Sequence, residues 1–317
     1  MRIQKNIPLN NLTTFGIGGP AEFFVKVRNL KDLKQAFGFA KNNQLPITVL
    51  GGGSNVLIND AGVKGLVVLV ANNRVKINDT KVVAGAGAPL DEVVEKTLKK
   101  NLRGLENLSG IPGTIGGAVF GNAGMWSKYL SDNLVVVDFF NGEKLIRFSK
   151  EECGFATKHS VFKELSGVIW LVHLRLEKGT PTNKEKLNLR QAIKAYRDVR
   201  YPPENRTVGS FFKNVLAEEF PQEFKAKLPG YIFFKNPRQE IGAGFLIESA
   251  GLPGRSSGGA IVLPHQANCI VNFNRASAED VINLAQKVQK VVFGRYGVRL
   301  KPEVQLLGFE KDPLMSS

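Results

Sequence analysis

The residues best suited to chemistry lie in short glycine-rich or polar segments, of which the first follows an apolar stretch. It reads Leu50-Gly51-Gly52-Gly53-Ser54-Asn55. Glycines after a strand let the backbone approach a ligand without Cβ clashes, and the N–H groups of such a turn can bind an anion. No Gly-Lys-Ser/Thr follows, so this is not a Walker loop. A glycine-rich turn without a ligand is the alternative interpretation.

A second and longer glycine-rich segment runs from Leu108 to Gly124. It reads Leu108-Ser109-Gly110-Ile111-Pro112-Gly113-Thr114-Ile115-Gly116-Gly117-Ala118, and Gly121-Asn122-Ala123-Gly124 follows. Ordering so many glycines costs conformational entropy, and a structural turn needs only one or two of them. The segment therefore predicts backbone wrapped against a large flat ligand that carries phosphates.

Three further segments contain side chains typical of catalytic or substrate-binding sites. They are Gly209-Ser210-Phe211-Phe212-Lys213-Asn214, Pro264-His265-Gln266-Ala267-Asn268 and Leu300-Lys301-Pro302-Glu303-Val304. No Gly-x-Ser-x-Gly surrounds Ser210, which argues against a hydrolase nucleophile. Taken one at a time, a turn serine, a surface histidine and an edge-strand glutamate are the simpler interpretations.

The composition is that of a folded chain with room for two domains. The chain has 317 residues, of which 43% are hydrophobic and 22% charged, and domains usually have about 100–200 residues. The net charge of +15 favours anionic partners such as a phosphorylated cofactor or a nucleotide-sugar. The basic residues are spread along the chain without a recognition-helix or zinc-finger spacing, which argues against nucleic acid as the main partner.

Cysteine content and hydropathy indicate the cellular compartment in which the protein works. Cys153 and Cys269 cannot form a disulfide framework and lack metal-ligand spacing, so we expect a reducing cytoplasm and no metal site. The sequence has no apolar run of about 18 residues and no signal-peptide core near its start. We therefore expect a cytoplasmic protein without a membrane partner.

The elements that must position these segments alternate between strands and helices. Apolar periodicity and capping residues predict helices over 29–41, from Pro89 to about residue 100, over 182–198 and over 278–293. Strands are predicted over 46–50, 66–70, 81–84, 134–140 and 168–176. This mixture predicts an α+β fold, and the Gly/Pro-marked hinge at residues 178–181 predicts domains over 1–180 and 181–317.

The segments, in their order along the chain, resemble the UDP-N-acetylenolpyruvoylglucosamine reductases. The resemblance begins at Asn11-Leu12-Thr13-Thr14-Phe15-Gly16-Ile17-Gly18-Gly19-Pro20-Ala21 and ends over 300–308. It includes the two glycine-rich segments, Gly209–Asn214 and Ala243–Gly251. Each piece is moderately specific, whereas the ordered set covers nearly the whole chain.

The resemblance implies an FAD-binding domain of the vanillyl-alcohol-oxidase (PCMH) type, followed by a smaller α+β substrate-binding domain. Its last strand can pack back on the first domain. FAD would be bound without a covalent bond, and NADPH would be the co-substrate. The residues that the resemblance assigns to FAD are Gly51, Gly52, Gly53, Ser54, Asn55, Ser109, Gly110, Pro112, Gly113, Thr114, Gly117, Ala118, Asn122 and Gly124.

The resemblance also implies a reaction, the reduction of the enolpyruvyl group of UDP-N-acetylglucosamine-enolpyruvate in peptidoglycan precursor synthesis. Ser210 matches the family's proton donor, and Glu303 matches the glutamate thought to stabilise the enolic intermediate. The residues expected to contact the diphosphate, sugar and carboxylate are Arg197, Arg200, Asn214 and Gln266.

One position departs from the family pattern. The family usually has Tyr-Arg where this chain has Thr157-Lys158, and lysine keeps the charge but loses the planar fork of arginine. Lys158 is therefore the candidate for the carboxylate contact. The departure also supports an alternative, a flavin- or nucleotide-sugar-binding pseudoenzyme. A flavin oxidase of the same superfamily is a further alternative, and the chain looks like the branch of the family that lacks a tyrosine-bearing substrate loop.

Overall fold

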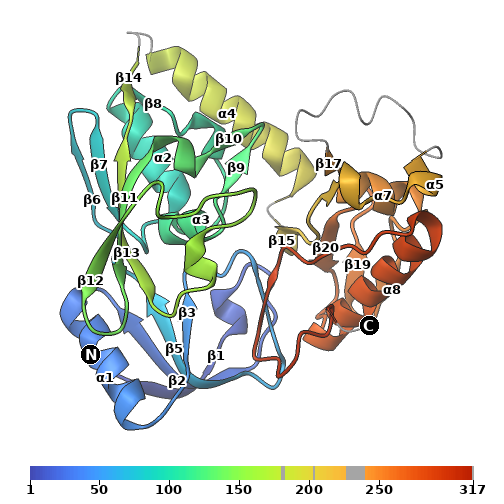
Figure 1. Ribbon diagram of the computed structural model, residues 1–317, viewed down its shortest axis with the longest axis horizontal. Coiled ribbons are helices and arrows are strands. Elements are labelled where there is room, and N and C mark those ends of the chain that lie inside the picture. Colours follow the sequence, from blue (N-terminus) through green and yellow to red (C-terminus); the bar gives the residue numbers. More distant parts are fainter. Residues whose placement is uncertain (180–182, 203, 226–239, 316–317) are drawn as a thin grey trace. The chain divides into compact units, whose positions relative to one another are not determined.

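The computed structural model describes residues 1–179, 183–202, 204–225 and 240–315. Contacts divide the chain into two compact units, each built from separate stretches (Figure 1). The first unit consists of Met1–Ile7, Ala21–Gly53 and Lys64–Val199. The second consists of Pro8–Pro20, Ser54–Val63 and Arg200–Ser317.

The first unit is built on two sheets. One has the strand order β1 (Gln4–Pro8), β2 (Pro20–Val27), β5 (Val63–Val70), β3 (Ile47–Leu50). The other has the order β12 (Leu145–Ser149), β11 (Leu134–Phe140), β13 (Val168–Arg175), β7 (Lys81–Gly85), β6 (Val75–Asn78). Short pairs are β8 (Leu102–Arg103) with β14 (Glu177–Lys178), and β9 (Gly124–Met125) with β10 (Lys128–Tyr129).

Four helices belong largely to this unit, and their ends follow from the sequence. They are α1 (Leu30–Asn42), α2 (Leu90–Lys99), α3 (Ile115–Phe120) and α4 (Asn183–Arg200). Asn29 caps α1 by accepting a hydrogen bond from the Asp32 N–H at 2.9 Å. Pro89 directly precedes α2 and supplies its N-cap position, as expected of a residue without an N–H. The predicted helices and strands of this part are confirmed to within a few residues.

A buried carboxylate ties three strands of the second sheet. Asp138 on β11 accepts hydrogen bonds from Arg147 Nε on β12 and from His173 Nε2 on β13, both at 2.9 Å. Burial opposes ionisation of this carboxyl, but the hydrogen bonds from Arg147 and His173 outweigh it and lower the pKa of Asp138.

We expect Asp138→Asn to lower the melting temperature at pH 7 and to lower it less as the pH falls below about 3.9. A carboxyl whose folded pKa is depressed stabilises the fold above its unfolded pKa of about 3.9, and this contribution is lost as the pH falls through the folded value. Thermal unfolding at several pH values measures the difference. Asp79→Asn is the matched control, because its ion pair with Lys178 at 2.8 Å is exposed and should contribute little. A constant difference across pH would contradict this account.

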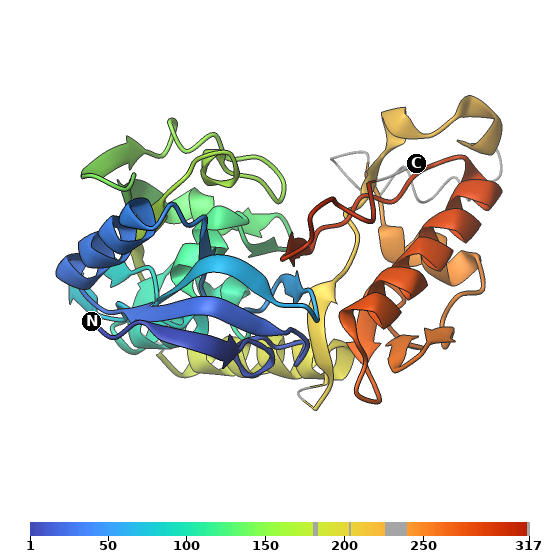
Figure 2. The ribbon, with the colours of Figure 1, turned by 90° about the horizontal axis from the view of Figure 1, so that it is seen from below.

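The second unit has a small sheet covered by a long helix. Its strand order is β15 (Arg206–Ser210), β20 (Cys269–Asn272), β19 (Ala260–Val262), β18 (Ser256–Ser257). Two further pairs are β16 (Val215–Leu216) with β17 (Glu240–Ile241), and β21 (Gln305–Leu307) with β4 (Val56–Ile58). The helices are α5 (Gln222–Lys225), α7 (Ala243–Ser249) and α8 (Ala278–Tyr296), which is the long helix of this unit in Figure 2.

Helix α8 has a defined start and end. Ser277 accepts from the Asp280 N–H while the Asp280 side chain accepts from the Ser277 N–H, and Gly297 ends the helix with a φ of +68°. Its buried face packs into one core with Phe15, Ile17 and Leu57. Segments from the beginning and the end of the chain therefore share one hydrophobic core.

The two compact units have other boundaries than the domains predicted over 1–180 and 181–317, because each unit combines separate stretches of the chain. Asp91 of α2 accepts a hydrogen bond from Arg190 of α4 at 2.7 Å, which explains why most of α4 belongs to the first unit. In the second unit β21 pairs in parallel with β4, so the last strand packs on an N-terminal segment of the sequence. Some parts of the sequence lie outside the described residues. They include Thr182, the first residue of the helix predicted over 182–198, and residues 226–239.

Candidate active site

The two glycine-rich loops of the first unit lie directly against each other. A Cβ atom on Gly52 would lie 2.6 Å from the Cα of Gly113, and one on Gly51 would lie 2.9 Å from Thr114 Oγ1. Real Cβ atoms do not approach a backbone so closely, so glycine at position 52 is required by the packing of the loops themselves. This requirement exists whether or not a ligand is bound, and the sequence did not reveal it.

Gly117 has the opposite environment. It lies in the first turn of α3, where Thr114 Oγ1 accepts a hydrogen bond from its N–H at 3.3 Å. The residue is exposed, and a Cβ there would meet only Thr114 Oγ1 at 3.6 Å. Because alanine is favoured over glycine in a helix, the described protein contacts give no reason for glycine here. The open space beside Gly117 is therefore a candidate ligand surface.

Helices α2 and α4 together hold the loop at Gly110 through its backbone N–H and carbonyl groups. The Gly110 N–H donates to Asp91 Oδ1 at 2.8 Å, and its carbonyl accepts from Arg197 Nε at 3.1 Å. The other Asp91 oxygen accepts from Arg190 at 2.7 Å and from Lys194 at 3.3 Å. Arg197, predicted to bind the substrate, thus contacts the predicted cofactor loop.

Two predicted cofactor residues of this unit have buried polar side chains. Ser109 donates its hydroxyl to the carbonyl of Glu106 at 2.6 Å, so this group is used inside the loop. Asn122 is only 4% exposed, and its Nδ2 donates to the Ala156 carbonyl at 3.0 Å. Its Oδ1 is buried and has no hydrogen-bond partner. A buried acceptor in this state fits a ligand that offers an N–H or O–H.

Lys158 occupies a tight turn next to Asn122. Ala156 and His159 exchange two backbone hydrogen bonds of 3.2 Å, which leaves Thr157 and Lys158 at the tip. Lys158 has a φ of +55°, and its carbonyl accepts from Lys163 Nζ at 2.8 Å. His159 lies 3.4 Å from Glu164 Oε1.

The hairpin after Asn122 has two residues with left-handed backbone at its turn. Trp126 and Ser127 connect β9 and β10 with φ values of +52° and +61°. Such a two-residue turn favours glycine or asparagine. Trp126 is 53% exposed and packs against Tyr196 of α4, with the ring centres 5.3 Å apart.

In the second unit, Ser210 ends β15 opposite Cys269. The next two residues are fixed by Asn268, whose carbonyl accepts from Phe211 N at 2.8 Å and whose Oδ1 accepts from Phe212 N at 2.9 Å. The Phe211 carbonyl then accepts from the Glu303 N–H at 2.8 Å. Ser210 and Glu303, far apart in sequence, are therefore held by one short stretch of backbone.

A chain of hydrogen bonds leads from Arg200 to Ser210. Arg200 donates to Gln266 Oε1 at 3.1 Å, Gln266 Nε2 donates to the Tyr201 hydroxyl at 2.9 Å, and that hydroxyl lies 3.4 Å from Ser210 Oγ. Tyr201 was not predicted as a site residue from the sequence. The available signal was its place between a predicted substrate arginine and Pro202.

The other predicted residues of this unit have mainly structural contacts. Asn214 Oδ1 accepts from the Ala243 N–H at 3.2 Å, at the start of α7, and its Nδ2 donates to Glu240 at 3.2 Å. Asn55 Nδ2 donates to the Glu303 carbonyl at 3.2 Å. Asn55 thus contacts the predicted catalytic segment, although it was predicted to bind the cofactor.

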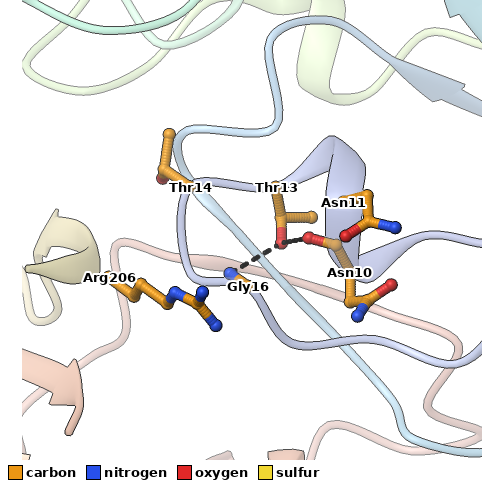
Figure 3. A pocket seen from close by; sticks show the side chains of 6 residues that line it. All are labelled: Asn10, Asn11, Thr13, Thr14, Gly16 and Arg206. Carbon is orange, nitrogen blue, oxygen red and sulfur yellow. Dashed lines mark hydrogen bonds between the residues drawn. The ribbon is translucent and has the colours of Figure 1, made fainter.

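A small polar cavity of about 190 Å³ lies in the same unit (Figure 3). Its lining is Asn10, Asn11, Thr13, Thr14, Gly16 and Arg206. The Arg206 side chain runs past Gly16, where a Cβ would lie 3.0 Å from Arg206 Cδ. Several lining residues belong to the Asn11–Ala21 motif, which indicated the family resemblance, but the cavity was not predicted from the sequence.

The predicted site residues therefore form two groups. The first unit contains Gly51, Gly52, Gly53, Ser109, Gly110, Pro112, Gly113, Thr114, Gly117, Ala118, Asn122, Gly124, Lys158 and Arg197. The second contains Ser54, Asn55, Arg200, Ser210, Asn214, Gln266 and Glu303.

The described residues offer no metal centre and no reactive thiol. They contain no cluster of three or more His, Cys, Asp or Glu suited to a metal ion. Burial raises the pKa of Cys153 to about 12 and that of Cys269 to about 11, so both thiols are protonated at neutral pH. Within the same described part of the chain, no helix combines the length and apolar character needed to cross a bilayer.

Comparison with known proteins first defines the class. Residues 21–144 match the model of a family described as an FAD binding domain, and these residues include both glycine-rich loops. Residues 201–307 match a family described as UDP-N-acetylenolpyruvoylglucosamine reductase, C-terminal domain. The protein is a flavoprotein oxidoreductase, and the predicted α+β fold with an FAD-binding domain is confirmed.

The whole chain then defines the family. A UDP-N-acetylenolpyruvoylglucosamine reductase of Solibacter usitatus is 32% identical over 97% of this chain and 97% of its own length. The reductase of Protochlamydia amoebophila is 34% identical, over 97% and 94%. A crystal structure of this reductase (MurB) from Thermus caldophilus matches 97% of this chain and 99% of its own, with a TM-score of 0.76 and 30% identity. The chain belongs to the UDP-N-acetylenolpyruvoylglucosamine reductase family.

Proposed function

We propose that this protein uses NADPH to reduce the enolpyruvyl group of UDP-N-acetylglucosamine-enolpyruvate to UDP-N-acetylmuramate, in the cytoplasm. The observation that carries the proposal is the backbone junction that holds Ser210 and Glu303 together, in a chain that also contains an FAD-binding domain. A flavin oxidase acting on another substrate gives no reason for Ser210, Asn214, Gln266 and Glu303 to occur together.

The loops of the first unit fit FAD. The open space beside Gly117 accepts a ligand without moving the protein, and the unpartnered Oδ1 of Asn122 fits an N–H donor. The loops at Gly52 and Gly113 pack closely, and glycine-rich turns of this kind can offer backbone N–H groups to a diphosphate. When bound, FAD supplies the hydride that reduces the double bond of the substrate.

The residues of the second unit supply the proton and the charges around the reacting group. Ser210 would give a proton to C2 of the enolpyruvyl group, and Glu303 would stabilise the enolic form of the substrate. The guanidinium of Arg200 suits the diphosphate, because it is always charged and donates several hydrogen bonds. Gln266, which contacts Arg200, and Asn214 would contribute amide groups to substrate binding.

The experiment that tests this function uses the purified protein and follows flavin absorbance. We expect a yellow protein that bleaches with NADPH under anaerobic conditions and regains its colour when UDP-N-acetylglucosamine-enolpyruvate is added. UDP-N-acetylglucosamine without the enolpyruvyl group is the control and should not restore the colour. If the substrate does not restore the colour after bleaching, the result would contradict the proposed reaction and favour the pseudoenzyme that only binds flavin or a nucleotide-sugar.

We expect Lys158→Ala to slow turnover. The expected loss of transition-state stabilisation is about 2–4 kcal/mol, the range for one lost electrostatic donor. Lys158→Arg should hold or raise activity, because a guanidinium can give two parallel hydrogen bonds to a carboxylate. Steady-state kinetics of both variants measures this. A loss of activity in Lys158→Arg would mean that the pocket is shaped for lysine, and unchanged turnover in Lys158→Ala would mean that Lys158 has no part in it.

A further inference from the structure

The hydrogen-bond chain from Arg200 to Tyr201 has a fixed direction. A guanidinium can only donate, so Arg200 requires the carbonyl oxygen of Gln266 at its 3.1 Å contact. The amide nitrogen of Gln266 then faces Tyr201 and donates to its hydroxyl at 2.9 Å. The Tyr201 oxygen therefore accepts from Gln266.

Ser210 Oγ lies 3.4 Å from the Tyr201 hydroxyl, and either oxygen can be the donor in this pair. When Tyr201 donates, Ser210 accepts and keeps its own proton for a group on its other side. This direction suits a serine that must give a proton away. A serine that donated to Tyr201 instead would have its proton already engaged.

We infer that Tyr201 is a positioning residue that acts through Ser210, an inference that rests on the proposed function. As the Ser210 O–H bond breaks and the proton forms a C–H bond at C2, the O–H electron pair stays on Oγ. Tyr201 gives its proton to Oγ in the same step, and the phenolate then takes a proton from water. A phenol is a stronger acid than an aliphatic alcohol, so the second transfer is downhill and no charge stays on the serine.

The surroundings of Tyr201 keep its ring in place without the hydroxyl. Its ring packs against the small hydrophobic cluster of Leu263, Cys269 and Val271, on the sheet that carries Ser210. Phenylalanine has the same ring, so Tyr201→Phe removes the hydroxyl and leaves these contacts. The half-buried position of Tyr201 also leaves it within reach of solvent protons.

The test measures the two half-reactions separately in the FAD-loaded protein by stopped flow. We expect Tyr201→Phe to leave FAD reduction by NADPH unchanged and to slow reoxidation by the enolpyruvyl substrate about 10- to 100-fold, as for one lost hydrogen bond to a developing charge. The matched control is Tyr296→Phe, which removes another tyrosine hydroxyl, 2.7 Å from Ser249 Oγ, and should leave both rates unchanged.

Two further measurements separate the relay from a structural effect. Reoxidation of the wild-type protein in mixtures of light and heavy water should depend on the deuterium fraction along a curve, because two protons move in one step, and Tyr201→Phe should make the dependence linear. The double variant Tyr201→Phe/Ser210→Ala should be no slower than Ser210→Ala, because Tyr201 acts through the serine.

The outcomes distinguish this inference from the proposed function. If Ser210→Ala is impaired while Tyr201→Phe reoxidises at the wild-type rate, the role of Tyr201 is overturned and the function stands. A linear dependence in the wild-type protein, which needs no variant to fold, also overturns the relay. If Ser210→Ala itself turns over normally, the serine is not the acid and both ideas fail together.

Discussion

Ser210→Ala should slow reoxidation of the reduced flavin by about 10²–10⁴-fold while reduction by NADPH stays nearly unchanged. The range is that of a general acid removed from a reaction that still has its binding groups. The hydroxyl is needed only when C2 takes its proton, so the two half-reactions respond differently. Stopped-flow absorbance of the flavin measures both rates in one preparation.

The control for Ser210→Ala is Ser249→Ala, which removes a hydroxyl that donates to the Phe245 carbonyl at 2.6 Å in α7. This variant should lose some stability and keep both half-reactions. If Ser210→Ala reoxidised at the wild-type rate, another donor such as a water held by Glu303 would have to be the acid.

Gly117→Val should abolish FAD binding in a protein that still folds. The Cβ of residue 117 would enter open space rather than protein, so the fold has no reason to resist it. A bound cofactor in that space would meet the new side chain. The ratio of flavin to protein absorbance after purification, together with the melting temperature, measures both effects.

Gly38→Val is the matched control for this experiment. Gly38 is an exposed glycine of α1 whose Cβ would meet nothing within 4 Å. It should keep the wild-type flavin content, and Gly52→Val should unfold or weaken the loops because its Cβ would meet Gly113. Full flavin occupancy in Gly117→Val would remove this position from the cofactor site.

Local elements of this protein could be predicted because their signals are local. The start of α8 at Ser277 and the helix after Pro89 follow from residues within one turn. The resemblance implied that the last strand packs back on the first domain. The register of β21 with β4 could not be predicted, because it joins residues about 250 positions apart through backbone hydrogen bonds that leave no pattern in either segment.

The site shows the same division. Ser210 and Glu303 were found from the family resemblance, and the backbone contact between their segments was not. Arg197 was predicted to contact the substrate. Its contact with Gly110 could not be predicted, because it depends on how α4 packs on the rest of the first unit. Tyr201 was missed, since its use depends on the direction of a hydrogen bond between two other side chains.

The scattered origin of the second unit has a consequence for its synthesis. Phe15 and Leu57 leave the ribosome well before their core partners on α8 and before the strand that pairs with β4, because those residues lie far later in the sequence. A growing chain must keep these early apolar residues from aggregating until its C-terminal part emerges. A fragment that starts near residue 200 would lack Phe15, Ile17 and Leu57, and expression of this unit alone requires grafting residues 8–20 and 54–63 back onto it.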